Sequence, residues 1–161
     1  MVTVDTVDLE KSIDTYVDLL TKALKNSVTQ VMYGTANAIV ENTPVGDIDT
    51  YYELYFKRLA ANGWYIEEGM LLANWGFHLN TDEGSFNKEV RDTEGNLVTK
   101  SIIEVMREYE LGDSITASNS TPYAQNIENG QSAQAPQGTV KPTEEALLDI
   151  YKIQFKDFLN G

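Results

Sequence analysis

The chain has 161 residues, of which 42% are hydrophobic and 10% aromatic, so it is long enough for one domain with its own core. It contains no cysteine, which excludes disulfides, thiolate metal sites and a cysteine nucleophile. Twelve basic residues against 25 acidic ones give a formal net charge of −13. Such a surface repels duplex DNA, because DNA binding depends on cations that displace counterions from phosphates. The charge indicates either simple solubility or a place beside DNA that the protein must not bind.

No apolar run is long enough to cross a membrane, so no membrane association is expected. The N-terminal stretch lacks both the basic start and the apolar core of a secretory signal. We therefore expect a protein that is synthesised and remains in a cytoplasm.

The strongest helical pattern runs from residue 8 to residue 41, where apolar residues recur at steps of three and four. Its members are Leu9, Ile13, Tyr16, Val17, Leu20, Leu24, Val28 and Val31, continuing to Ala38 and Ile39. At about 1.5 Å per residue this helix would be roughly 50 Å long, which is more than one small core covers. We expect part of the stripe to pack along the chain's own sheet and the remainder to face a neighbouring subunit. Gly34 is a candidate for a bend or a break.

Pro44 is expected to end this helix, because the residue before a proline is pushed out of the α region. Asp49 or Thr50 can then cap a second helix over residues 50–62, with Gly63 as its C-terminal glycine. This region is rich in aromatic residues, namely Tyr51, Tyr52, Tyr55, Phe56, Trp64 and Tyr65. Tyrosine and tryptophan are favoured at interfaces, where an apolar body is buried and a polar tip is satisfied. The cluster is therefore either a partner interface or a satellite core.

The next elements are shorter. Residues 69–80 favour a strand, with Trp75, Phe77 and Leu79 on one face and Asn74, Gly76 and His78 on the other. Residues 81–96 are polar and contain glycine, which predicts a loop or loose hairpin. Residues 100–113 predict a third helix that turns Ile102, Ile103, Met106 and Tyr109 inward and stops at Gly112. Residues 114–118 predict a short strand.

The C-terminal residues 141–161 predict a last helix, with Thr143 as its cap and two glutamates in its first turn. Its apolar residues spread around much of the circumference. This breadth predicts burial on two sides or docking of the helix on a partner.

The segment 118–140, SNSTPYAQNIENGQSAQAPQGTV, follows neither the strand period nor the helix period. It is also longer than the connections that compact domains usually contain, unless those connections are functional or disordered. Its second half is small, uncharged and flexible in composition. We expect this half to project from the body and to pack or pair with another chain.

The first half of the segment contains start and stop signals for a very short helix. Thr121 can be its N-cap, Pro122 occupies the first position, and Gly130 can close the end. Tyr123 and Ile127 are four residues apart, so their side chains point the same way. Because one or two turns of helix do not persist alone in water, we expect these two side chains to dock it.

Several residues of this segment resemble a family of tailed bacteriophages. They are Asn119, Pro122-Tyr123-Ala124, Glu128, Gly130, Ser132, Gln134-Ala135-Pro136 and Gly138. The pattern is similar to the tail-completion proteins of the minor tail protein Z type, which belong to the head–tail joining (neck) proteins. Earlier pieces follow in the family's order, namely a long N-terminal helix, Asn-Thr-Pro-Val at Asn42–Val45, and Gly-x-Leu-x-x-x-Trp at Gly69–Trp75. The resemblance covers roughly residues 9 to 140.

The resemblance implies a single α+β domain over residues 1–161. A small antiparallel β-sheet would be packed by a long N-terminal helix and further helices, with a long projecting loop near 118–140. It implies a structural virion protein at the head–tail junction, synthesised in the host cytoplasm, with no catalytic activity and no cofactor or metal. The chain would form a homo-oligomeric ring, a hexamer or alternatively a dodecamer. The ring would contact the tail tube or terminator protein and the head-side connector proteins.

The ring would surround the channel through which genomic DNA passes without specific binding. We hypothesise that the acidic charge lines this channel, because a wall that repels phosphate does not retain DNA.

One departure from the family pattern concerns residues 45–68. In the family, the Thr-Pro-Val segment runs almost directly into the tryptophan strand, whereas here about twenty residues intervene, and we interpret them as an aromatic-rich helical insertion. The expected interface residues are Tyr123, Ile127, Gln131, Gln134, Ala135, Pro136 and Gln137 of the loop, and Tyr51, Tyr52, Tyr55 and Phe56 of the insertion. The expected turn residues are Thr121, Pro122, Gly130 and Gly138.

Enzymatic activity is the weaker hypothesis. His78 is the only histidine available for a serine–histidine–aspartate triad, and its position in an aromatic strand favours a structural role. The chain has no glycine-rich phosphate loop with lysine, no His-Glu-x-x-His motif and no twelve-residue calcium loop. The stronger alternatives are a tail terminator or a head-side portal adaptor. A further alternative is an acidic DNA mimic that inhibits a nucleic-acid enzyme.

Overall fold

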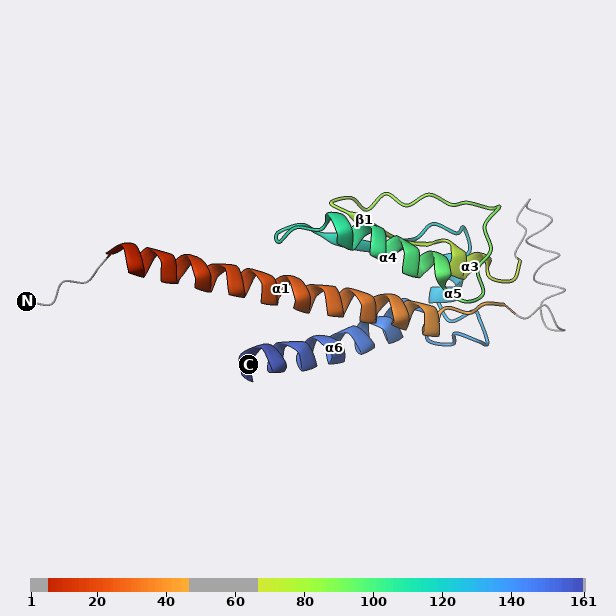
Figure 1. Cartoon of the computed structure of the whole chain (residues 1–161). Coiled ribbons are helices and arrows are strands. Elements are labelled where there is room, and N and C mark those ends of the chain that lie inside the picture. Colours follow the sequence, from red (N-terminus) through yellow and green to blue (C-terminus); the bar gives the residue numbers. More distant parts are fainter. Residues whose placement is uncertain (1–5, 47–66, 161) are drawn as a thin grey trace, which may run out of the picture.

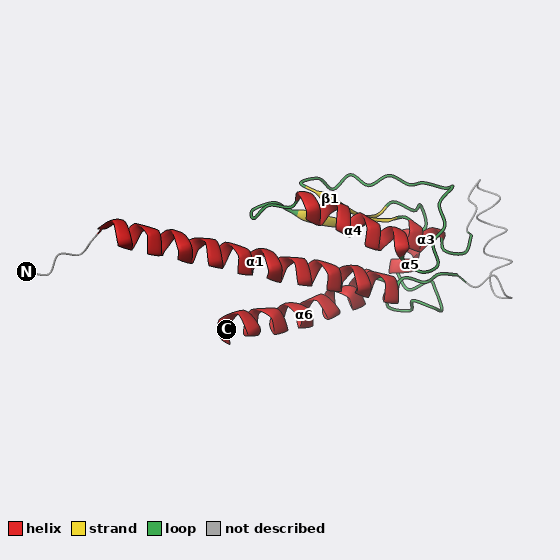
Figure 2. Cartoon of the chain, in the orientation of Figure 1, coloured by secondary structure: helices red, strands yellow, loops and turns green. Residues whose placement is uncertain are grey.

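The computed structural model describes residues 6–46 and 67–160 (Figures 1 and 2). In chain order, its elements are α1 (Thr6–Asn42), α3 (Met70–Ala73), β1 (Trp75–Leu79), α4 (Asn96–Glu108), β2 (Ile115–Asn119), α5 (Ala124–Glu128) and α6 (Val140–Asn160). The long N-terminal helix and the small antiparallel sheet confirm the predicted α+β class. The aromatic helix predicted over residues 50–62, with Tyr51, Tyr52, Tyr55 and Phe56, lies outside the described residues.

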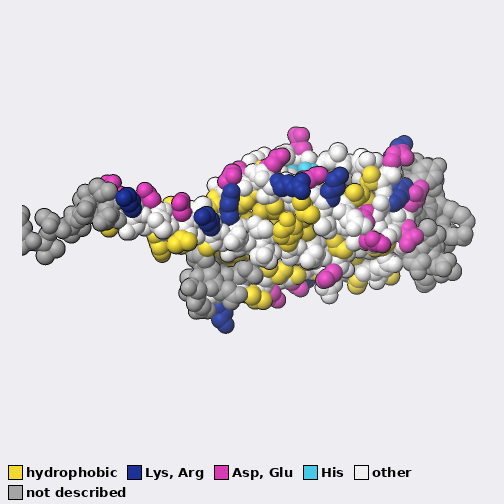
Figure 3. Space-filling model, viewed as in Figure 1, with side chains coloured by type: hydrophobic (Ala, Val, Ile, Leu, Met, Phe, Trp, Pro, Cys, Tyr) yellow, Lys and Arg dark blue, Asp and Glu magenta, His cyan; other side chains and the backbone are white. Residues whose placement is uncertain are grey.

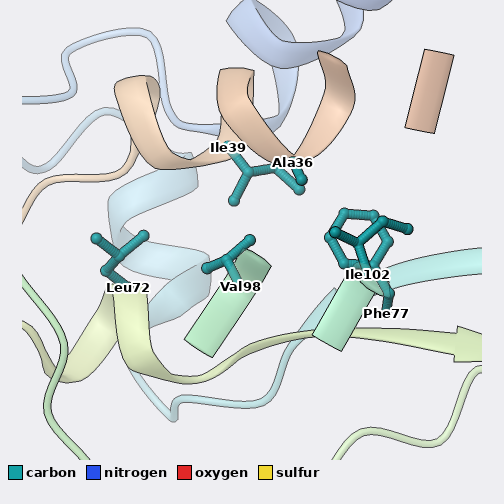
Figure 4. Close-up of a cluster of buried hydrophobic side chains, with 6 residues drawn as sticks. All are labelled: Ala36, Ile39, Leu72, Phe77, Val98 and Ile102. Atoms are coloured by element: carbon teal, nitrogen blue, oxygen red, sulfur yellow. The ribbon is translucent and has the colours of Figure 1, made fainter. Parts of the chain in front are cut away.

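Helix α1 runs through the length of the molecule, with α4 and the sheet on one side and α6 on the other (Figure 1). The core lies where α1 meets α3, β1 and α4. It is formed by six side chains, each no more than 4% exposed: Ala36, Ile39, Leu72, Phe77, Val98 and Ile102 (Figure 4). Only the C-terminal half of α1 contributes to this core, which confirms that one small core does not cover the whole helix.

Strands β1 and β2 pair antiparallel, with Phe77 opposite Ala117. The loop that follows β1 contains no regular element, as predicted. It is fastened by Asn74, whose side-chain amide donates to the backbone oxygen of Asn87 at 3.0 Å and accepts from the Asn87 N–H at 2.7 Å. The sheet and the loop therefore form one unit on the body.

Helix α4 begins at a cap that the chain builds from Asp92. The carboxylate of Asp92 accepts the backbone N–H groups of Glu94, Gly95 and Leu97. Those of Gly95 and Leu97 are among the donors that the start of a helix leaves without partners. Gly95 has a φ of 81°, and a Cβ built there would lie 2.4 Å from Cγ2 of Val40. A glycine is needed at this position because it permits both the left-handed backbone and the close approach to α1.

Helix α6 packs antiparallel along α1, and Gly34 marks the contact. A Cβ at Gly34 would lie 2.6 Å from Cδ1 of Ile150, so the missing side chain leaves the space that Ile150 fills. Helix α1 continues through Gly34, so the break considered at this residue does not occur.

Three predicted element boundaries were wrong. Residues 69–80 are not one strand, because the apolar run Met70–Ala73 forms a helical turn before β1 starts at Trp75. The third helix is α4, which begins four residues earlier than predicted and ends at Glu108, before Gly112. Thr143 does not cap the last helix, since it lies inside α6 and its hydroxyl donates to the Thr139 oxygen.

Candidate interaction surfaces

The N-terminal part of α1 extends beyond the body of the molecule (Figure 1). Because Ile150 lies against Gly34 in an antiparallel pair, and both helices rise 1.5 Å per residue, α6 ends opposite about residue 24. On the other side, Lys25 Nζ forms an ion pair with Glu110 Oε2 at 2.5 Å. Residues 6–24, about 28 Å of helix, therefore project as an arm.

The arm has an apolar stripe that no other part of the described chain covers. Leu9, Ile13, Tyr16, Val17 and Leu24 are between 44% and 63% exposed. At 100° per residue these five positions fall within an arc of about 100° around the helix axis. The same arc includes Gly34, which contacts α6 nearer the C-terminal end of α1. Figure 3 shows hydrophobic side chains gathered along one side of the arm. The stripe therefore continues the α6-covered face of α1 past the end of α6.

Helix α5 is docked as the sequence predicts. Tyr123 is 4% exposed and packs with Met70 and Leu71 of α3, and Ile127 joins the same cluster. Burial raises the pKa of the Tyr123 phenol, because the ionised form loses its hydration. The N–H of Gly130 donates to the Ile127 oxygen, and the N–H of Gln131 donates to the Asn126 oxygen. These two bonds form a Schellman motif, so Gly130, with φ 76°, is the predicted C-terminal glycine.

Thr121 and Pro122 differ from their predicted roles in the first turn. The helix proper starts at Ala124, and the Thr121 hydroxyl bonds to the side chain of Asn119 instead of capping the helix. Asn119 in turn donates to the Leu71 oxygen at 2.7 Å. Hydrogen bonds thus connect the end of β2, the turn at Thr121 and α3.

The second half of the segment is folded back on the body, which corrects the expectation of a projecting loop. Ser132, Ala135 and Thr139 are all buried. Gly130 faces the backbone oxygen of Pro136, and a Cβ there would lie only 2.6 Å from it. The N–H of Gly46, beyond the end of α1, donates to the Gln134 side chain at 3.2 Å. Residues 129–139 therefore form a closed loop with a defined conformation.

Glu128 closes this loop. Its Oε2 accepts the N–H groups of Thr139 at 2.9 Å and Val140 at 3.0 Å, at the N-terminus of α6. A negative charge is favourable at that end of a helix. A Cβ at Gly138 would lie 2.6 Å from Oε1 of Glu128, so the predicted turn glycine leaves room for the cap. Sequence reasoning missed this role of Glu128, although it is the only charged residue between positions 114 and 140.

The structure separates the predicted interface residues of the segment into two groups. Tyr123 and Ala135 are buried within the chain itself, and Ile127 is partly buried beside Tyr123. These three side chains pack the segment onto the body of its own chain. Gln131, Gln134, Pro136 and Gln137 are exposed, so they are available for contact with another chain.

His78 and Ser118 form the arrangement closest to a catalytic pair among the described residues. His78 Nε2 lies 2.9 Å from Ser118 Oγ across the sheet, and both line a cleft of about 300 Å³. The backbone of Gly84 covers the serine, since a Cβ on Gly84 would lie 2.5 Å from Ser118 Oγ. The close approach of Gly84 restricts access to the serine, and the hydrogen bond between His78 and Ser118 connects β1 to β2.

The charged side chains are mixed in sign on the face shown in Figure 3. At one end of the sheet, Asp113 accepts from the Asn80 amide at 2.8 Å and from the Glu110 N–H at 2.7 Å. These hydrogen bonds lower the pKa of Asp113. Within residues 6–46 and 67–160, no group of three or more histidine or carboxylate side chains is arranged to hold a metal ion.

No helix in the described part of the chain is both long and apolar enough to span a membrane. Comparison of the chain with protein-family models, with curated protein sequences and with solved structures finds no match. Inferences about function therefore depend on the surfaces described above and on the sequence resemblance.

Proposed function

We propose that the chain is a structural subunit of the neck of a tailed phage, where it completes the tail and joins it to the head as a ring around the DNA channel. The observation that supports this proposal most is the arm. A helix that extends about 28 Å from its own body with a continuous apolar stripe is suited to packing against another protein chain.

The chemistry of the described residues favours assembly over catalysis. The only histidine, His78, shares a hydrogen bond with Ser118, and Gly84 lies close against that serine. In contrast, among the described residues six exposed large hydrophobic side chains lie on α1 and four on α6, so most of the exposed apolar surface belongs to these two helices. The sequence resemblance to neck proteins supplies the kind of assembly, and the ring, with six or twelve copies, follows from it.

Location in the particle tests the proposal directly. Peptide mass spectrometry of purified virions would detect the chain, and antibody labelling followed by imaging would place it. We expect label at the head–tail junction and about six copies per particle, or about twelve for a ring on the head side. Absence of the chain from particles would refute the proposal, and nuclease inhibition by the purified protein would then favour the DNA-mimic alternative.

The arm itself can be tested with a matched pair of variants. The double variant Leu9→Ser/Ile13→Ser changes the stripe at positions that make no core contacts, so the fold should survive. Leu19→Ser is the control, because Leu19 is 61% exposed on the same helix but lies well outside the arc of the stripe. We expect the stripe variant to be lost from virions and the control to be incorporated. Equal incorporation of both would show that the stripe is not an assembly surface.

A further inference from the structure

The outer edge of β2 is unpaired, and the register of the sheet shows which backbone groups it presents. The Asn80 N–H donates to the Ser114 oxygen, so residues 80 and 114 form a hydrogen-bonded pair. Such pairs alternate along an antiparallel ladder, and the next ones are 78 with 116 and 76 with 118. The N–H and C=O groups of Ile115 and Ala117 therefore point away from β1.

The two edges of this sheet differ. On β1, the outward N–H of Phe77 donates to Ser101 Oγ at 2.8 Å, and the Ser101 hydroxyl reaches the Phe77 oxygen at 3.4 Å. Helix α4 thus satisfies the outward groups of Phe77, in the middle of the β1 edge. On β2, none of the described residues hydrogen-bonds the outward groups of Ile115 or Ala117, and Ala117 is exposed.

Strand β2 also lacks the features that usually protect an exposed edge. Its sequence, Ile-Thr-Ala-Ser-Asn, contains no proline and no charged residue, and its pairing with β1 is continuous, without a bulge. A two-stranded sheet gains from a third strand, because one more ladder of hydrogen bonds satisfies the open edge. An extended segment of another chain can therefore add to β2.

The charge distribution indicates which chain that is. From residue 114 to residue 140 the only charge is Glu128, whereas the chain average of 23% would place about six charges in 27 residues. The Glu128 carboxylate is used internally at the start of α6. A basic partner would bind best to the acidic remainder of the surface. A second chain of net charge −13, in contrast, meets less repulsion at a strand that carries no charged side chain.

We propose that the free edge of β2 is a strand-addition site for an extended segment of a second copy of this chain. A contact of this kind between one edge and a different segment of the next copy is heterologous, as a closed ring requires. The inference rests on the ring-forming part of the proposed function.

Two substitutions of Ala117 test whether the β2 edge binds a strand of another copy. Ala117→Pro removes an N–H that the β1–β2 ladder does not use, and a proline is tolerated at an edge strand. Ala117→Glu places a carboxylate on the edge. Asn37→Glu is the matched control, because Asn37 is exposed on α1 and the change in net charge is the same. Circular dichroism and thermal unfolding would verify that each variant is folded.

Self-association of the purified full chain is the readout, by sedimentation velocity and native mass spectrometry over a range of concentrations. We expect both Ala117 variants to weaken association at least tenfold and Asn37→Glu to change it less than twofold. Hydrogen exchange on the wild-type chain supplies a second readout that needs no variant. The amides of Ile115 and Ala117 should exchange rapidly at low concentration and at least tenfold more slowly in the assembled form.

A wild-type chain that stays monomeric up to its solubility limit would overturn the inference. So would Ala117 variants that assemble like the control, or an assembled form in which these two amides still exchange rapidly. None of these results decides whether the chain is located at the neck, which the virion experiment tests separately. Conversely, edge pairing in a chain that is absent from virions would leave this inference intact and refute the neck assignment.

Discussion

Replacing Gly34 with alanine tests the packing that defines the arm. Within a helix, alanine is favoured over glycine by about 1 kcal/mol, so the change alone would stabilise α1. In the folded chain, however, the new Cβ would lie 2.6 Å from Cδ1 of Ile150. The Ile150 side chain would have to move, and overpacking of this kind costs about 1–3 kcal/mol. We expect Gly34→Ala to lower the free energy of unfolding by about 1 kcal/mol.

Ile150→Val provides the matching background. It removes the Cδ1 atom and leaves the two γ carbons at 3.4 and 3.5 Å from the new Cβ, which is ordinary contact. Alone, Ile150→Val should cost about 1 kcal/mol through the lost burial. In this background Gly34→Ala should stabilise by about 1 kcal/mol, since the helical preference is no longer opposed. The coupling between the two positions is then about 2 kcal/mol.

Urea unfolding followed by far-ultraviolet circular dichroism, at one fixed protein concentration, measures all four chains of this double-mutant cycle. An effect of Gly34→Ala that agrees within about 0.5 kcal/mol in the two backgrounds would refute the contact between Gly34 and Ile150. The end of α6 would then not lie opposite residue 24, and the arm would have a different boundary.

Three further substitutions test individual contacts. Gly95→Ala should destabilise by about 2–3 kcal/mol, from a left-handed backbone and a collision with Val40. Gly112→Ala, also at positive φ but with nothing within 4 Å, should cost only about 1 kcal/mol in the same urea assay. Glu128→Ala should lower the free energy of unfolding by about 2 kcal/mol, because α6 loses the carboxylate that accepts its first N–H groups. The control Glu144→Ala, at an exposed position of the same helix, should lower it by less than about 0.5 kcal/mol. Tyr123→Phe removes a buried hydroxyl without a partner among the described residues, so stability at pH 7 should rise by about 1 kcal/mol. Because burial raises the folded pKa of Tyr123, wild-type stability should decline above about pH 10, where the unfolded phenol ionises. Tyr123→Phe should lessen that decline.

The elements predicted well from the sequence are those whose pattern is long or is fixed by local chemistry. Helix α1 has an apolar period that persists over many turns, and Gly130 ends α5 by a rule that involves only neighbouring residues. The turn α3 was missed because Met70–Ala73 is apolar throughout and all four residues are buried, so no period distinguishes helix from strand. Gly69 starts the turn with φ 71°, a conformation that a single sequence does not reveal.

The errors in the segment 118–140 come from contacts between residues distant in sequence. Thr143 satisfies the local rule for a cap, but the N–H groups at the start of α6 are bound by Glu128, eleven residues before Thr139. Likewise, the small residues of the loop were interpreted as flexible. Their small size is also what allows the chain to return closely on itself at Gly130 and Gly138. Composition does not distinguish these two outcomes, because the choice depends on whether a surface is present for the loop to pack against.

The uneven distribution of charge bears on whether so acidic a chain can form the proposed assembly. With a net charge of −13, two copies repel at long range, and only short-range contacts can offset that repulsion. In the proposed assembly, the arm would supply apolar area, and the β2 edge would supply backbone hydrogen bonds at a strand without charged side chains. Both contributions act within a few ångströms, whereas the repulsion is screened over about 8–10 Å at physiological salt. Assembly of the purified chain should therefore strengthen as salt is raised from low ionic strength. A contact that depended on opposite charges between copies would instead weaken.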